Sequence, residues 1–170
     1  MSAIDATKKT AAAANTATLP RARRKTVAVV LALLLGSLGV HRFYLRGVGD
    51  WVGWLYPLPT ALGWWGVDRV LTYGQDDKLS WVLIPMLGFA MAAACLTGIV
   101  YALMEREAWN RQFNPQWPAD TRAGATSWLT IGALVMSLLV GTVSFMGSLT
   151  FGIQRYFEYQ IEDCLLYTSR

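Results

Sequence analysis

Charged residues are scarce in this chain of 170 residues: they make up 15% of it, whereas hydrophobic residues make up 54%. A soluble globular domain carries about 25% charged residues, because its surface must be solvated. The shortage of charge therefore argues against an ordinary soluble domain and predicts a membrane protein.

Residues that carry catalysis or bind metals are also scarce. The chain has a single histidine, His41, and two cysteines, Cys95 and Cys164. One histidine cannot make a metal site, and two cysteines cannot form a disulfide framework. No nucleophile elbow and no acidic pair accompanies a general base. We therefore expect no enzyme activity, no metal and no cofactor.

Long uncharged stretches dominate what is present. There are four of them: Thr26–Val40, Trp51–Val67, Leu79–Met104 and Ala123–Gln154. A hydrocarbon core of about 30 Å needs roughly 20 helical residues, so the last two stretches are long enough to cross it. The first two reach that length only by including His41–Leu45 and Asp68–Leu71, with Arg42 and Arg69 extending to the headgroups.

A bilayer excludes open strands, so these stretches predict an all-α membrane protein with four transmembrane helices arranged as two helical hairpins. We divide the chain into a disordered basic tail (1–25), a first hairpin (26–73), a second hairpin (79–154) with a polar connection at 105–125, and a polar C-terminal tail (155–170). A buried soluble hairpin is the alternative for the first two stretches.

Basic residues are concentrated near the N-terminus, where six stand against one acid, Asp5: Lys8, Lys9, Arg21, Arg23, Arg24 and Lys25. Such a cluster beside an apolar helix sets membrane topology and attracts anionic lipid, and we expect no nucleic-acid partner. With four crossings, the positive-inside rule predicts that both termini are cytoplasmic and that Trp117 lies on the opposite side. A signal peptide and a mitochondrial presequence are alternatives for this region.

The first hairpin carries charges that an antiparallel arrangement would pair. Arg42 is expected near Asp50 at one end, and Lys25 near Asp68 at the other. Pro57 and Pro59 predict a kink in its second helix.

Small residues recur every four positions in the second hairpin. Such ridges allow helix backbones to approach closely within a bilayer. We therefore expect helix packing, and self-association, through these residues: Ala90, Ala94, Gly98, Ala102, Ala133, Ser137 and Gly141.

A spaced motif in Ala32–Leu71 resembles the TM2 domain family, whose members have two transmembrane helices. The motif falls on Gly36, Gly39, His41, Arg42, Phe43, Tyr44, Gly47, Trp64, Trp65 and Asp68. The chain departs from the family at Arg46, where members often have glycine, and at His41, where some have aspartate. The resemblance implies a helical hairpin and a membrane location, but it implies no defined reaction.

The sequence thus favours an integral membrane protein that serves as an interaction or scaffold module, with a cytoplasmic N-terminus. Its expected partners are the lipid bilayer, anionic lipid at the basic cluster, and a second copy or another membrane protein. The alternative is a small transporter or channel subunit that uses Asp68 and His41 as ion or proton groups.

Overall fold

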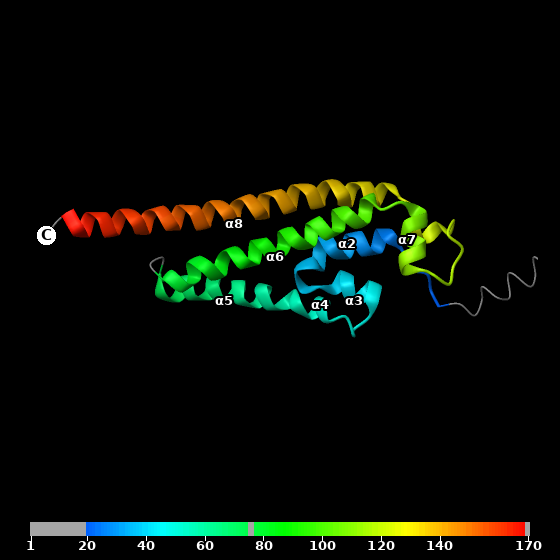
Figure 1. Ribbon diagram of the computed structural model, residues 1–170, viewed down its shortest axis with the longest axis horizontal. Helices are drawn as coiled ribbons and strands as arrows, with labels where there is room; N and C mark the ends of the chain where they lie inside the picture. The colour runs from blue at the N-terminus through cyan, green and yellow to red at the C-terminus, as the bar shows by residue number, and fades with distance from the viewer. Residues whose placement is uncertain (1–19, 75–76, 169–170) are drawn as a thin grey trace, which may run out of the picture.

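The computed structural model describes residues 20–74 and 77–168, and within these ranges the chain is helical and contains no strand (Figure 1). Two helices are long and apolar enough to cross a membrane: α6 (Lys78–Leu103) and α8 (Trp128–Thr168). The all-α prediction is confirmed, but four membrane-spanning helices are not. The predicted disordered tail lies mostly outside the described residues.

The first predicted membrane helix is broken in two. Helix α2 (Lys25–Leu35) leads through the 3₁₀ turn η1 (Gly36–Leu38) to α3 (Val40–Arg46). Gly39 ends η1 in the left-handed conformation, with φ at 74° and its N–H donating to the Gly36 carbonyl at 2.9 Å. This conformation reverses the chain, so α3 runs back beside α2 (Figure 1). At 1.5 Å per residue α2 is only about 16 Å long.

The next segment forms one nearly continuous helix. Helix α4 (Trp51–Leu55) is followed by α5 (Pro57–Tyr73), and Tyr56 between them keeps helical geometry. Pro57 tolerates this position because a residue at the start of a helix needs no N–H donor. The predicted proline interruption thus falls at the α4–α5 junction. Together the two helices are about 34 Å long.

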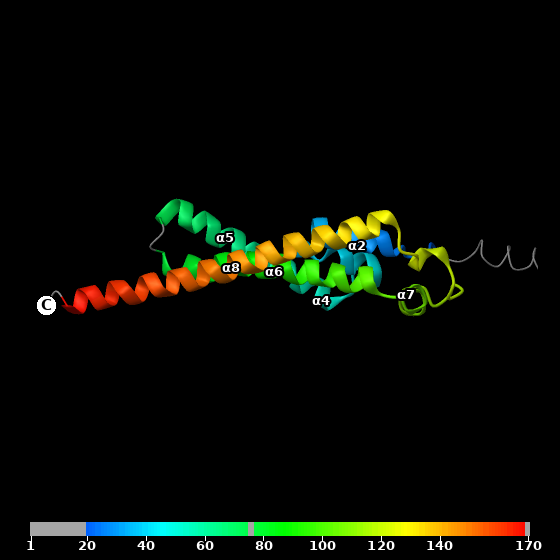
Figure 2. The same ribbon diagram turned by 90° about the horizontal axis from the view of Figure 1, so that it is seen from above.

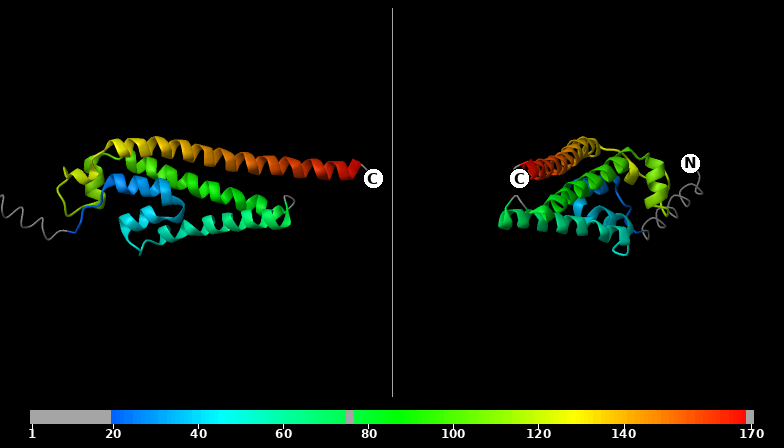
Figure 3. Two further views of the ribbon diagram at one scale, coloured as in Figure 1. Left: turned by 180° about the vertical axis from the view of Figure 1, so that it is seen from behind. Right: turned by 60° about the vertical axis from the view of Figure 1, so that its left-hand side comes forward.

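Helix α6 runs antiparallel to α4–α5, and α8 runs antiparallel to α6, along the long axis of the molecule (Figure 1). Seen from above, α8 lies over α6 along most of its length (Figure 2), and α2 contacts both helices. A short helix, α7 (Arg106–Phe113), and the turn η2 (Arg122–Gly124) connect α6 to α8. The last turns of α8 project past the end of α5 and the start of α6 (Figure 3).

The molecule therefore has two distinct ends. At the α7 end lie the starts of α2, α4 and α8, the ends of α3 and α6, and α7 itself; at the α5–α6 end lie the loop after α5 and the C-terminal part of α8 (Figure 1). A first core cluster at the α7 end combines Ala28, Leu45, Trp109 and Phe113. A second cluster joins α2, α6 and α8 through Val29, Ala102 and Ala133.

Two sequence-based expectations are corrected by this arrangement. The indole N–H of Trp117 donates to the Pro20 carbonyl at 3.0 Å, so the N-terminal segment and the α6–α8 connection share one end instead of facing opposite sides. Lys25 and Asp68 lie at opposite ends and do not pair (Figure 1). Both corrections have the same cause, because the reversal at Gly39 returns the chain to the end from which it came.

Candidate functional site

The first seven motif residues gather around the reversal between α2 and α3. A Cβ on Gly36 would lie 2.5 Å from the Ala94 Cβ, and one on Gly39 would meet the Gly53 carbonyl oxygen. Glycine is therefore required at both positions so that the reversal can pack against α6 and α4. Gly47 has φ at 83° and lies in open space at the turn after α3.

The aromatic motif residues tie this reversal to its neighbours. The Phe43 ring lies 5.3 Å from the Trp54 ring, over Gly53. The Tyr44 hydroxyl accepts a hydrogen bond from the Arg24 N–H at 3.0 Å. These contacts connect α3 to α4 on one side and to the start of α2 on the other.

His41 is fully buried inside the α7 end. Its ring lies 5.3 Å from that of Tyr56 and 6.2 Å from that of Tyr101. Neither ring nitrogen finds a hydrogen-bond partner among the residues that the structure describes. His41 thus occupies an aromatic cage and contributes no ligand cluster, and no group of three metal-binding side chains occurs in the described chain.

Arg42 forms the predicted pair with Asp50. Its Nε donates to the Asp50 carboxylate at 2.7 Å, across the turn between α3 and α4. The Arg42 guanidinium holds the pKa of Asp50 below its usual range, mainly through this hydrogen bond. The pair fixes the turn that follows α3.

The remaining motif residues, Trp64, Trp65 and Asp68, lie far from the reversal, on the exposed surface of α5. The glycines that flank the tryptophans carry the packing there: a Cβ on Gly63 would lie 2.5 Å from the Leu87 Cβ, and one on Gly66 would lie 2.6 Å from the Leu83 Cβ. The sequence reading singled out the tryptophans and missed these two glycines, whose three-residue spacing is the available signal.

The α5–α6 end is closed by a different ion pair. Arg69 donates to both Asp77 oxygens, at 2.7 and 2.9 Å, and the same carboxylate accepts from the Ser80 hydroxyl and caps α6. The Arg69 guanidinium holds the pKa of Asp77 well below its usual range, with help from Ser80. Asp68 remains exposed next to Arg69 in the chain, twelve residues along the helix from Tyr56, whose ring contacts His41.

Lys25 ties the start of α2 to the end of α6 and to the segment that precedes α8. Its ammonium donates to the carbonyls of Ala102 and Met104, at 3.3 and 2.9 Å, and to the Thr126 hydroxyl at 2.7 Å. The side chain is 1% exposed. A cation at the C-terminus of α6 satisfies carbonyls that have no partner within the helix and opposes the negative end of its dipole.

Helix α7 and Asn114, which follows it, hold the N-terminal segment through side-chain hydrogen bonds. The indole N–H of Trp109 donates to the Arg23 carbonyl at 3.0 Å, and Asn114 accepts from the Arg23 N–H at 2.7 Å. Asn110 donates to the carbonyls of Ala119 and Thr121, both at 2.8 Å. We call these contacts the α7 clamp. The spacing of Trp109, Phe113 and Trp117 was visible in the sequence, but their partners were not.

The small-residue ridge of α6 faces two helices at once. A Cβ on Gly98 would lie 3.3 Å from the Ala32 Cβ of α2 and 3.4 Å from the Ser137 hydroxyl of α8. The other ridge residues of α6, Ala90, Ala94 and Ala102, are buried, as are Ala133 and Ser137 of α8. On α8, a Cβ on Gly141 would lie 2.9 Å from the Cys95 Cβ. The ridges are thus occupied within the chain.

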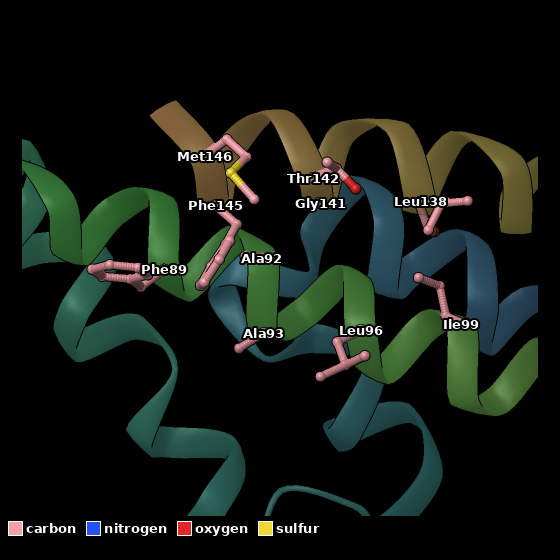
Figure 4. Close-up of a pocket in the computed structure, with 11 residues that line it drawn as sticks. Phe89, Ala92, Ala93, Leu96, Ile99, Leu138, Gly141, Thr142, Phe145 and Met146 are labelled. Carbon is pink, nitrogen blue, oxygen red and sulfur yellow. The ribbon is translucent and has the colours of Figure 1, made fainter. Parts of the chain in front are cut away.

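On the outer side of the same helix pair lies an apolar groove of about 440 Å³ (Figure 4). Its floor contains small residues, among them Ala93 and Gly141, and its sides carry Leu96, Leu138 and Phe145. Almost no polar atom reaches it. We call it the α6–α8 groove. It lies on helices that bury little of their apolar surface, since only 17% of the most apolar 18-residue stretch of α8 is buried.

A comparison with protein families finds a match between the TM2 domain and residues 21–68. The match begins with the basic segment held by the α7 clamp and ends at Asp68, so it includes α2, α3, α4 and most of α5. No curated protein and no solved structure gave a match to the chain. The matched family and the two long apolar helices indicate a membrane protein. The chain therefore carries a TM2 domain at residues 21–68, as its motif predicts.

Proposed function

We propose that the chain is a multi-pass integral membrane protein that binds another transmembrane helix, and that it acts as an interaction module without catalysis. The partner is a second copy of the chain or another membrane protein. The observation that carries the proposal is the α6–α8 groove, which offers a long apolar surface with a small-residue floor. Small residues let a further helix approach closely where lipid supplies no hydrophobic drive.

The arrangement in the bilayer follows from the lengths of the helices. Helices α4–α5, α6 and α8 each exceed the roughly 20 residues or 30 Å that a crossing needs, whereas α2 does not. We infer three crossings, with α2 and α3 entering and leaving from the α7 end. Irregular backbone at membrane depth is tolerated where protein covers it, and α4, α5 and α6 cover this reversal.

The distribution of basic residues supports one orientation in the membrane. Among the described residues, nine lie at the α7 end: Arg21, Arg23, Arg24, Lys25, Arg42, Arg46, Arg106, Arg111 and Arg122. Three lie at the α5–α6 end: Arg69, Lys78 and Arg155. Because cytoplasmic loops carry the excess of Lys and Arg, we place the α7 end in the cytoplasm, where anionic lipid is a further partner. The N-terminal segment is then cytoplasmic and the end of α8 is not.

The groove can be tested with a photoreactive amino acid in the full chain in native membranes. Leu138 lines the groove, whereas Val135, of nearly equal exposure on the same helix (59% and 57%), does not. We expect a protein adduct of one defined mass from position 138 and lipid adducts alone from position 135. Ala93→Phe fills the floor and should remove most of the adduct from position 138. Lipid adducts alone at both positions would contradict the proposal.

The transporter alternative predicts a different result. It needs Asp68 and His41 to serve one pathway, but His41 is buried against Tyr56, whereas Asp68 is exposed twelve residues further along the same helix, about 18 Å away. Liposomes containing the protein and a pH-sensitive dye should therefore show no flux above that of empty liposomes. A proton flux that disappears in His41→Ala would favour the transporter instead.

A further inference from the structure

We infer that a hollow between the starts of α2 and α8 binds the phosphate group of an anionic phospholipid. The hollow encloses about 660 Å³, and Arg21 and Arg24 line it on one side and Arg122 on the other. The hydroxyls of Thr26 and Ser127 lie between them, and no acidic residue lines it. We call it the headgroup pocket. This inference rests on the proposed membrane location and makes the expected anionic lipid a ligand of one defined site.

The three guanidiniums of the headgroup pocket are available to a ligand. In the part of the chain that the structure describes, no ion pair joins Arg21, Arg24 or Arg122 to a carboxylate, whereas Arg42 and Arg69 are both paired. A guanidinium presents parallel N–H donors that match two phosphate oxygens. Three such groups around a hollow without a carboxylate form a site for phosphate.

Both walls of the pocket are held in place before any ligand arrives. The α7 clamp holds the backbone at Arg23 on one side and at Thr121 on the other. The walls are also joined directly, because the Thr26 hydroxyl lies 3.1 Å from that of Ser127 and 2.8 Å from that of Thr130. Binding therefore costs little ordering of the backbone, which favours affinity.

The surroundings favour a lipid over a soluble phosphate. Val27 and Leu129 line the same pocket and are 39% and 64% exposed, so acyl chains would meet apolar side chains beside the arginines. Trp128, 87% exposed next to them, suits the membrane interface. The pocket lies at the basic α7 end, where the cytoplasmic leaflet supplies anionic lipid.

Native mass spectrometry of the full chain in detergent tests the pocket, with dioleoyl phosphatidic acid and dioleoyl phosphatidylcholine as probes. We expect one retained phosphatidic acid and no retained phosphatidylcholine. Arg24→Gln and Arg122→Gln should each lower the retained fraction about tenfold, the loss expected for a charge-assisted hydrogen bond. Arg122→Lys should retain an intermediate amount, because an ammonium lacks the planar fork.

Arg46→Gln is the matched control, because Arg46 is exposed at the same end and does not line the pocket. An equal loss of retained phosphatidic acid in the Arg46→Gln variant would mean that the lipid is held by general charge attraction. That result would overturn the site. Displacement of the lipid by millimolar inorganic phosphate, with no preference for phosphatidic acid, would make the site one for soluble phosphate. Unfolded variants are recognised by circular dichroism, and Arg122→Lys then decides the outcome. Photoadducts at Leu138 with no bound lipid would overturn this inference alone.

Discussion

At the scale of single residues, Gly39 decides the course of the chain. Position 39 requires glycine for two reasons, its left-handed conformation and its close contact with the Gly53 carbonyl. Other glycines of the chain allow the two reasons to be tested one at a time. Gly47 shares the positive φ but lies in open space, and Gly49 has neither constraint. These three positions form a matched series.

We expect Gly39→Ala to destabilise the protein by about 2–5 kcal/mol, because a left-handed alanine costs about 1–2 kcal/mol and a packing clash a further 1–3 kcal/mol. Gly47→Ala should cost only the first amount, and Gly49→Ala should change stability by less than about 0.5 kcal/mol. Thermal unfolding in mild detergent measures the series. Equal stability of the Gly39→Ala and Gly49→Ala variants would refute the reversal.

Residue pairs were predictable where the partners are close in the sequence. Arg42 and Asp50 flank one turn, so their pairing followed from the connection between two helices. Lys25 was assigned to Asp68, but its acceptors lie 77 to 101 residues away at Ala102, Met104 and Thr126. Two of these are backbone carbonyls, which no side-chain pattern reveals.

At the scale of helices, hydropathy identified the long elements and missed the short ones. Leu79–Met104 was recognised because an uncharged stretch of that length has few alternatives in a bilayer. The stretch Thr26–Val40 was extended to Leu45 to reach the length of a crossing, whereas the structure breaks it at Gly36–Gly39. Gly36 and Gly39 were recognised as motif residues but not as a reversal, since local propensity does not say whether a glycine permits contact or turns the chain.

The ridge of α6 gives a prediction at this scale. Gly98→Leu should destabilise the bundle by about 1–3 kcal/mol, because the new side chain must displace α2 and α8 together, and Gly98→Ala should cost less. Gly132→Leu on α8 is the control, since nothing lies within 4 Å of its Cβ position. Thermal unfolding of the three variants in detergent would measure the difference. A Gly132→Leu variant as unstable as Gly98→Leu would argue against close packing of α2, α6 and α8 at Gly98.

At the scale of the whole molecule, the reversal at Gly39 leads us to propose three crossings of the membrane in place of four. Four crossings return the C-terminus to the starting side, whereas three leave it on the other. A count of basic residues could not correct the predicted number of crossings, because the positive-inside rule assigns sides only after the crossings are known. The hydrogen bond from Trp117 to Pro20, which brings their two segments to one end, supports the three-crossing arrangement that we propose.

Cysteine labelling in intact cells tests the three-crossing arrangement, in a Cys95→Ala, Cys164→Ser background. We expect Gln116→Cys at the α7 end to be protected from an impermeant maleimide and Gln160→Cys on α8 to react. Lysed cells, in which both positions should react, provide the control. Reaction at position 116 with protection at position 160 would mean that the orientation is the opposite of the one proposed. Protection of both positions would mean that the number of crossings between them is even.

The hydrogen bonds made by Lys25 also bear on how the protein is made. The acceptors of its ammonium lie at the end of α6 and just before α8, and the ridge that receives α2 lies on α6, so all of them are made after the TM2 domain. Until they arrive, a helix of about 16 Å with a lysine at its start has no protein cover in the membrane. In the arrangement that we propose, the packing of α2 is therefore completed only after α6 and the start of α8 have been made.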